Sequence, residues 1–290
     1  MPSLLDIRRR IRSVKNTQQL TKAMKTVSAA KLRRAQERVV SARPYAEQLR
    51  RVLANLAKTA QSISHPLLES RPEERVLIVI VTADRGLCGA FNSNLIRATQ
   101  NLLREHSGHA SRLYTVGRKG RDFFKRRAVP SAGEYINFFS RLDYGNARDI
   151  SAHIVDLYTK QEVDAVYLVY NEFKSVIQQR VAVEKLLPLA PVDAEPEPQT
   201  AGKYNLPDYI YEQPPQEVFN RLLPRYVETQ VYRALLESAA SEHGARMAAM
   251  DTASRNAGEM IETLTLNMNR IRQAAITREI IEVVSGAGAQ

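Results

Sequence analysis

The sequence predicts a mixed α and β fold, in which the two ends of the chain form a long antiparallel coiled coil around an inserted α/β domain. Three observations carry this prediction. Both terminal segments have heptad periodicity. Between them, short β-rich apolar runs alternate with helical periods. The net charge of +11 is concentrated at one end of the chain.

The N-terminal segment, residues 1–58, is predicted to be one helix from about residue 3. Its apolar positions alternate spacings of four and three, and at about 1.5 Å per residue it would be ~80 Å long. Ser3 and Asp6 form an acceptable capping box at its start. Pro44 departs from the helical pattern. An interior proline destabilises a helix by about 3 kcal/mol, so we expect a bend or local break there.

The seam of this helix is apolar at both ends but polar from Gln18 to Ser28. Over that stretch the apolar residues Leu20, Met24 and Val27 lie one position off the heptad phase. We therefore expect the off-phase stripe to face a different neighbour from the rest of the seam.

Residues 59–215 are predicted to form a Rossmann-like α/β domain with its linkers. The apolar run Val76–Val81, the longest in the chain, has only six residues and is read as a buried strand rather than a membrane span. Proline-rich residues 188–215 are expected to form a surface excursion. In order, the predicted elements are a strand at 76–82, a helix at 90–104, a strand at 112–116, a helix at 120–127, a strand at 134–138, a helix at 146–160, and strands at 164–170 and 176–187.

The C-terminal segment, residues 216–290, is predicted to be a second long helix ending near Ser285. Pro224 marks a late start or a kink, and Gly286 and Gly288 are natural stops. This helix is longer than the first, so its last ~15 residues should extend past the N-terminus by ~20 Å. That end is apolar on more than one face, which predicts that other chains enclose it.

The charge pattern indicates an acidic partner. Residues 1–58 hold 15 Lys and Arg against three Asp and Glu, and the remainder of the chain is close to neutral. Such a segment suits nucleic acid, lipid headgroups or an acidic protein surface. A basic coiled-coil protein associated with nucleic acid is the main alternative function, although only Tyr45 among the basic residues could stack on bases.

An enzyme built on the α/β insert is a second alternative, but no acid–base constellation supports it. The loop Asp84–Gly89 lies between a predicted strand and helix and lacks the glycine fingerprint of a dinucleotide site. We read it as a tight turn. His106 and His109 have no evident third metal ligand and are expected to be solvated. The single cysteine, Cys88, excludes an internal disulfide. The sequence therefore predicts no catalytic residue, no cofactor and no metal.

Four ordered motifs carry a resemblance to a known family. They are the opening IRSVKNTQQLTKAM, the stretch Ser41–Tyr45, the loop Thr82–Gly89 and the ending Ile276–Ala287. Along its whole length the chain resembles the gamma subunit of F-type ATP synthase. Lys25, which replaces an acidic or neutral residue, and Pro224 depart from the family pattern. The regulatory cysteine pair of chloroplast relatives is absent.

The resemblance implies a non-catalytic central rotor shaft, which couples proton flow through the c ring to ATP synthesis or hydrolysis at the beta subunits. The implied partners are the alpha and beta subunits of an alpha3beta3 ring, the epsilon subunit and the c ring, without nucleic acid and without a membrane span. The assembled complex would be a proton-transporting two-sector ATPase. The lack of a transit peptide or plastid insert favours a bacterial chain, peripheral on the cytoplasmic side of the inner membrane.

The resemblance also implies site residues. Acidic loops of beta would face a group of shaft cations, polar residues near the tip would contact beta, and two further residues lie in a region that matters for coupling. Two residues at the foot would meet the c ring and epsilon. The shaft cations are Lys22, Lys25, Lys31, Arg33 and Arg34. The polar residues near the tip are Arg272, Gln273, Thr277 and Glu279. The coupling region contains Met24 and Arg246, and the foot residues are Tyr211 and Glu212.

Overall fold

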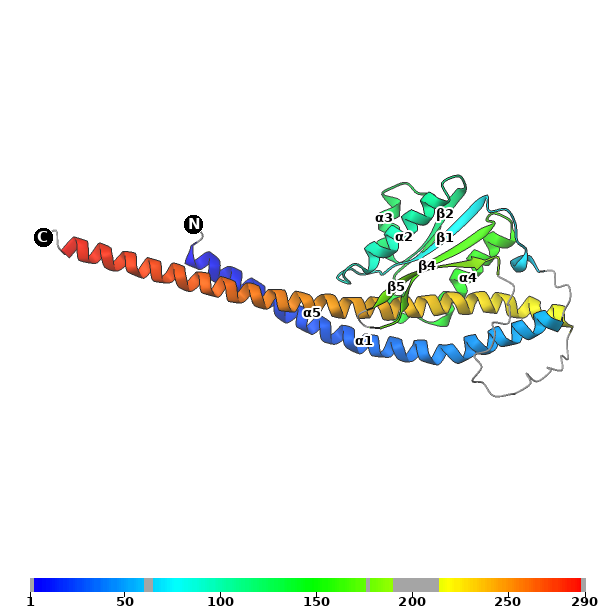
Figure 1. Ribbon diagram of the computed structural model, residues 1–290, viewed down its shortest axis with the longest axis horizontal. Coiled ribbons are helices and arrows are strands. Elements are labelled where there is room, and N and C mark those ends of the chain that lie inside the picture. The colour runs from blue at the N-terminus through cyan, green and yellow to red at the C-terminus, as the bar shows by residue number, and fades with distance from the viewer. Residues whose placement is uncertain (1–2, 60–64, 176–177, 190–213, 288–290) are drawn as a thin grey trace. The chain divides into compact units, whose positions relative to one another are not determined.

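The computed structural model describes residues 3–59, 65–175, 178–189 and 214–287. Two long helices, α1 (Leu4–Thr59) and α5 (Pro215–Ala287), enclose an α/β segment in the order of the chain (Figure 1). Contacts divide the chain into two compact units, one of residues 1–30 with 246–290 and one of residues 31–245. The predicted fold class, a coiled coil with an inserted Rossmann-like domain, is confirmed.

The larger unit is built on a five-stranded sheet with the order β3-β2-β1-β4-β5. The first four strands pair in parallel, and β5 is antiparallel to β4. The crossovers are supplied by three helices, and single-turn 3₁₀ helices lie at Pro66–Leu68 and Phe139–Arg141. The elements are β1 (Arg75–Val81), α2 (Phe91–Glu105), β2 (Ala110–Val116), α3 (Arg118–Lys125), β3 (Ser131–Tyr135), α4 (Tyr144–Thr159), β4 (Ala165–Phe173) and β5 (Gln179–Leu187).

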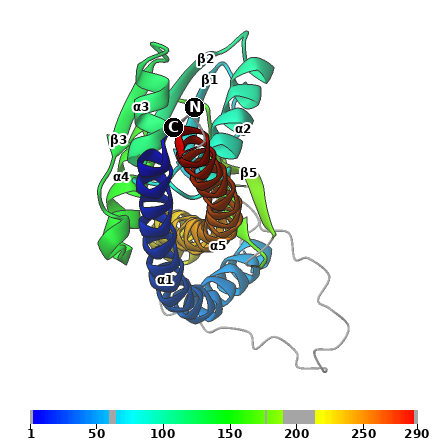
Figure 2. The same cartoon turned by 90° about the vertical axis from the view of Figure 1, so that its left-hand side faces the viewer.

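The central strand β1 is buried on both faces. Val76, Ile78 and Ile80 pack in one cluster with side chains of α2 and α3. Because successive side chains of a strand alternate, Leu77 and Val79 point to the opposite face. There α4 and the first part of α5 lie beneath the sheet (Figures 1 and 2). Each such side chain contributes about 1.5–3 kcal/mol on burial, which explains why the uninterrupted apolar run became a strand covered on both sides.

The predicted strands and helices are found, with shifted ends. The third strand shows the largest difference, at 131–135 instead of 134–138. Sequence pattern alone does not fix strand ends, because neighbouring strands decide where the hydrogen-bonded ladder stops. The expected excursion at 188–215 falls mostly outside the described residues.

Of the bend or local break expected at Pro44, the break does not occur, since α1 continues through this residue without interruption. Proline removes one backbone hydrogen bond, but side chains on both sides of it are buried. Val39 is 7% exposed, Leu49 7% and Leu53 0%. Packing over these turns holds the helix in place.

In the smaller unit, α1 and α5 run antiparallel. Residues with higher numbers in α1 contact residues with equal or lower numbers in α5. Gln18 Nε2 donates to the Ser254 carbonyl, Thr21 and Ser254 share a hydrogen bond, and Lys25 pairs with Asp251. The same offset places Leu4, where α1 begins, opposite about residue 272 of α5. The residues of α5 beyond that point have no partner helix within the described chain.

Candidate coupling surface and supporting polar sites

The polar part of the coiled-coil seam is a satisfied contact. Thr21 and Ser28 are buried at their heptad positions, and Thr21 Oγ1 lies 2.7 Å from Ser254 Oγ. Small hydroxyl side chains let two helices approach while pairing their own polar groups. Leu20 and Val27 are 61% and 55% exposed, so the off-phase stripe faces away from α5. That these exposed side chains face a different neighbour stays a prediction.

The five cations implied by the resemblance are all exposed on α1. Lys25 Nζ lies 2.6 Å from Asp251 Oδ1, and this pair, although exposed, lowers the pKa of Asp251 through the lysine hydrogen bond. Arg33 pairs with Glu37 one turn along the same helix at 3.3 Å. Solvent screens exposed pairs of this kind strongly, so both cations can exchange these partners for an external acid.

The remaining residues of the coupling set lie on the same two helices, α1 and α5. Met24 and Arg246 are half-buried. The tip residues Arg272, Gln273 and Glu279 are exposed, and the Thr277 hydroxyl donates to the carbonyl of Gln273. Tyr211 and Glu212, the predicted foot residues, lie outside the described residues.

Apolar side chains surround these polar tip residues. They carry no partner within the described chain, which agrees with a helix end that exceeds the reach of α1. Their exposed fractions run from 48% to 72%, at Ile276, Ile280, Ile281, Val283 and Val284. A contiguous apolar surface of this kind marks a site of protein contact.

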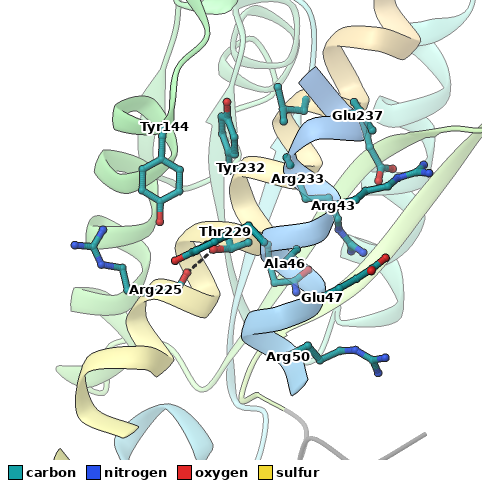
Figure 3. A pocket seen from close by; sticks show the side chains of 15 residues that line it. Arg43, Ala46, Glu47, Arg50, Tyr144, Arg225, Thr229, Tyr232, Arg233 and Glu237 are labelled. Carbon is teal, nitrogen blue, oxygen red and sulfur yellow. Dashed lines mark hydrogen bonds between the residues drawn. The ribbon is translucent and has the colours of Figure 1, made fainter. Parts of the chain in front are cut away.

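The larger unit contains a cleft of about 670 Å³ between the middle of α1 and the first part of α5 (Figure 3). Arg43, Arg233 and Glu237 are among its lining residues. Glu237 is 9% exposed, its Oε2 has no hydrogen-bond partner, and burial raises the pKa of this carboxyl group. Arg233 and, to a lesser extent, Arg43 oppose that rise. The cleft therefore places a buried carboxyl group of α5 beside α1.

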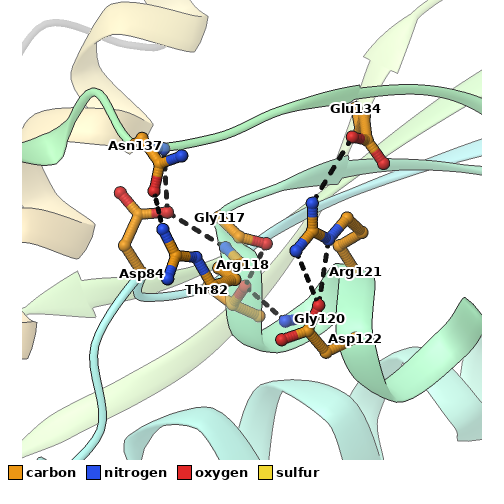
Figure 4. A network of polar contacts seen from close by, with 9 residues as sticks. All are labelled: Thr82, Asp84, Gly117, Arg118, Gly120, Arg121, Asp122, Glu134 and Asn137. Atoms are coloured by element: carbon orange, nitrogen blue, oxygen red, sulfur yellow. Dashed lines mark hydrogen bonds and ion pairs between the residues drawn. The ribbon is translucent and has the colours of Figure 1, made fainter.

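A polar network closes the carboxyl ends of the first three strands (Figure 4). One carboxylate oxygen of Asp84 accepts from the backbone N–H groups of Arg118 and Asn137, each at 3.0 Å. The hydroxyl of Thr82 accepts from the Gly120 N–H at 2.8 Å and the Ala83 carbonyl accepts from the Lys119 N–H at 3.1 Å.

This network has a chemical consequence. In parallel α/β sheets, nucleotide phosphates bind free N–H groups at a helix N-terminus near the strand ends. Here the first three N–H groups of α3 are already bonded to Asp84, Ala83 and Thr82. The start of α3 thus offers no free N–H group to a phosphate, and Asp84, in the loop after β1, ties three strands together.

One expectation about the histidines is wrong. His109 is exposed, but His106, at the end of α2, is half-buried rather than solvated. Its Nε2 lies 3.6 Å from Glu73 and its ring lies 5.2 Å from that of Tyr167. No sequence pattern signals this contact, because Glu73 and Tyr167 are brought to His106 by the sheet.

Sequence reasoning also missed the residues that attach α5 to the sheet. Ser238, Ser241 and Arg233 contact Asn171 of β4 and Glu184 of β5. The signal that could have found them is two small hydroxyl residues three apart within a largely apolar stretch of helix.

Comparison with known proteins agrees with these features. The family model described as ATP synthase matches residues 3–289. The chain is 55% identical over 293 residues to the ATP synthase gamma chain of Solibacter usitatus, covering 100% of this chain and 99% of that one. It is 51% identical to the gamma chain of Pelotomaculum thermopropionicum, with the same coverage. The nucleic-acid alternative receives no support from these matches.

Solved structures are also similar. A chain from the central stalk and c ring of Tetrahymena thermophila mitochondrial ATP synthase is 28% identical, with a TM-score of 0.61, covering 81% of this chain and 99% of that chain. A chain from Euglena gracilis mitochondrial ATP synthase gives a TM-score of 0.68 at 20% identity, covering 99% and 94%, and supports the fold.

Proposed function

Because the chain belongs to the ATP synthase gamma-chain family, the central-stalk rotor of a membrane-associated ATP synthase, we propose that it is a non-catalytic shaft whose tip turns against an enclosing ring of alpha and beta subunits. The observation that carries this proposal is the end of α5, which is helical to Ala287, is unpaired beyond about residue 272, and exposes five large aliphatic side chains. A sleeve of apolar protein surface would bury them.

The proposed partners at the opposite end are the epsilon subunit and the c ring, which would contact the foot at Tyr211 and Glu212. The similar Tetrahymena chain belongs to a central stalk solved together with a c ring, which supports this assignment by analogy. In the described residues no helix is both long enough and apolar enough to span a membrane. The proposed location is the cytoplasmic face of a bacterial inner membrane, as the bacterial relatives support, with proton flow through the c ring as the drive.

Coupling is proposed to act through population shift. An asymmetric shaft presents a different face to each of three beta subunits and so biases each toward a different nucleotide affinity. The exposed cations of α1 would supply attractions to acidic beta loops that are weak enough to break at each step. The proposed contacts are the exposed α1 cations Lys22, Lys31 and Arg34, together with Lys25 and Arg33, which form exposed ion pairs within the chain. Met24 and Arg246 are proposed to act in the same coupling region.

We propose that polar residues near the tip contact the beta subunits, and replacing them with alanine tests the function. Replacing Gln273 and Thr277 together with alanine should lower gradient-driven ATP synthesis by about threefold or more while the complex still assembles, since a mutation of exposed helix positions costs little folding energy. The measurement is ATP synthesis by the reconstituted complex, normalised to the amount of assembled complex.

A matched control exists on the same helix. The Thr263 hydroxyl donates to the carbonyl four residues earlier, as that of Thr277 does, and it too is exposed. Thr263→Ala should leave synthesis unchanged. Equal rates in the tip variant and the control would contradict the proposed role of Gln273 and Thr277. Failure of the parent chain to assemble with alpha and beta subunits would contradict the shaft itself.

A further inference from the structure

The end of strand β4 is joined to helix α5 by two buried hydrogen bonds. β4 pairs with β1 only as far as Val169, so Asn171 lies beyond the last parallel pair. Its backbone N–H donates to Ser238 Oγ at 3.3 Å, and its carbonyl accepts from Ser241 Oγ at 3.2 Å. These residues are at most 3% exposed. Two serines of α5 therefore satisfy backbone groups that β1 leaves without a partner.

A second link joins α5 to the neighbouring strand. The Arg233 guanidinium donates to Glu184 Oε2 of β5 at 2.7 Å. The other oxygen of Glu184 accepts from the Tyr170 hydroxyl, also at 2.7 Å. Thus α5 is tied through side chains to β4 and to β5, and the carboxylate between Arg233 and Tyr170 is held from two sides.

These bonds constrain rotation of the helix about its own axis. Residues three apart lie on one face of a helix, and turning the helix by one residue, about 100°, would remove both serine hydroxyls from Asn171. Hydrogen bonds are directional, so these contacts add an angular constraint to that of the buried apolar face of α5. Arg233 also lines the cleft between α5 and α1.

We propose that Ser238, Ser241 and the Arg233–Glu184 pair are positioning residues, called the register contacts, which fix the angle of α5 relative to the sheet. Torque that enters through the α/β domain then turns the shaft helix at a constant angle. This inference rests on the rotor role of the family and is independent of which tip residues touch beta.

The test uses the whole complex reconstituted in liposomes. The Ser238→Ala and Ser241→Ala double variant should keep ATP hydrolysis and assembly within about twofold of the parent. Synthesis driven by an imposed proton gradient should fall at least threefold per assembled complex, and the deficit should grow as the ratio of ATP to ADP opposing synthesis is raised. That load dependence is the readout that a general loss of folded protein would not produce.

Thr229→Ala is the matched control. Thr229 is a buried hydroxyl on the same helix, but it donates at 2.7 Å to the carbonyl of Arg225 in its own helix and makes no link to the sheet. It should show parent behaviour at every load. The proposal is overturned if the double variant synthesises ATP at the parent rate under all loads, or if its hydrolysis and synthesis fall in equal proportion.

A charge exchange keeps the proposal testable should the serine variant fail to assemble. Glu184→Arg and Arg233→Glu should each lower the coupled rate, because each places like charges together. The two combined should restore at least half of it. Assembled complexes in which the exchanged pair stays as low as the single variants would overturn the role of this link, whereas a parent chain that does not assemble would contradict the rotor function instead.

Discussion

At the scale of single residues, Asp164 shows how one buried acid holds the start of the sheet. Its carboxylate accepts from the backbone N–H of Arg75 at 2.9 Å and from the guanidinium of Arg75 at 3.0 and 2.7 Å. The side-chain hydrogen bond from Arg75 is the main cause that lowers the pKa of Asp164. One residue thus joins the first residue of β1 to the loop before β4.

We predict that Asp164→Asn lowers the free energy of unfolding by about 2 kcal/mol at pH 7. Because the folded pKa lies below the ordinary one, the stabilisation is present above the ordinary aspartate pKa and is lost as the pH falls through the lower value. Denaturant titrations of the parent and the variant should therefore converge in acid. A difference that does not change between pH 7 and pH 3 would contradict this account.

Glu237 should show the opposite pH dependence. Burial raises its pKa, so the folded chain holds its proton at a pH where the unfolded chain has released it, and stability declines as the pH rises through that interval. Relative to the parent, Glu237→Gln should gain stability as the pH rises from about 4 to about 7, since Gln carries no charge. Melting temperatures measured across this range test the prediction, and a constant difference would refute it.

At the scale of elements, the turn between β2 and α3 depends on Gly117. Its φ is +93°, and a Cβ at this position would lie 2.0 Å from the Thr82 carbonyl oxygen. We predict that Gly117→Ala costs at least about 3 kcal/mol of stability, because backbone strain and a clash with main-chain atoms act together. Gly108 is the control, since a Cβ there meets nothing within 4 Å.

Measured by chemical denaturation, Gly108→Ala should stay within about 0.5 kcal/mol of the parent. Similar losses in the two variants would mean that the strand-end network does not depend on close approach of Gly117 to Thr82. The same network explains why an α/β sheet of this topology offers no phosphate site at α3. The first three N–H groups of α3 are bonded to the Asp84 carboxylate, the Ala83 carbonyl and the Thr82 hydroxyl.

At the scale of the whole molecule, we propose that the uneven charge governs how the shaft contacts its partners. We predict that reversing Lys22, Lys31 and Arg34 to glutamate lowers coupled ATP synthesis and weakens its dependence on ionic strength, because salt screens attractions between exposed charges. Reversing the exposed cations Lys125 and Arg126 of the α/β domain is the matched control. The check is ATP synthesis by assembled complexes between about 20 and 300 mM salt. Identical salt profiles for the parent and the α1 variant would mean that these cations are only solvated and do not contact a partner.

Local sequence patterns were enough to predict the elements and the class of the fold. Heptad spacing specifies two long helices, and a six-residue apolar run rich in β-branched residues specifies a buried strand, because both patterns follow from the geometry of a single element. The unequal lengths of the two helices likewise predicted an unpaired, apolar tip. The break that was one of two expectations at Pro44 is absent, because packing of Val39, Leu49 and Leu53 holds the helix together there.

The pairing of distant polar groups, by contrast, emerges from the packed chain alone. Asn171 is bonded to serines 67 and 70 residues away, and Asp84 to backbone groups 34 and 53 residues away. No periodicity encodes these pairs. They arise because β4 extends past the point where its pairing with β1 ends, which leaves backbone groups for α5 to satisfy. Local patterns fix where an element buries its side chains, whereas the lengths and ends of neighbouring elements fix which polar groups need partners.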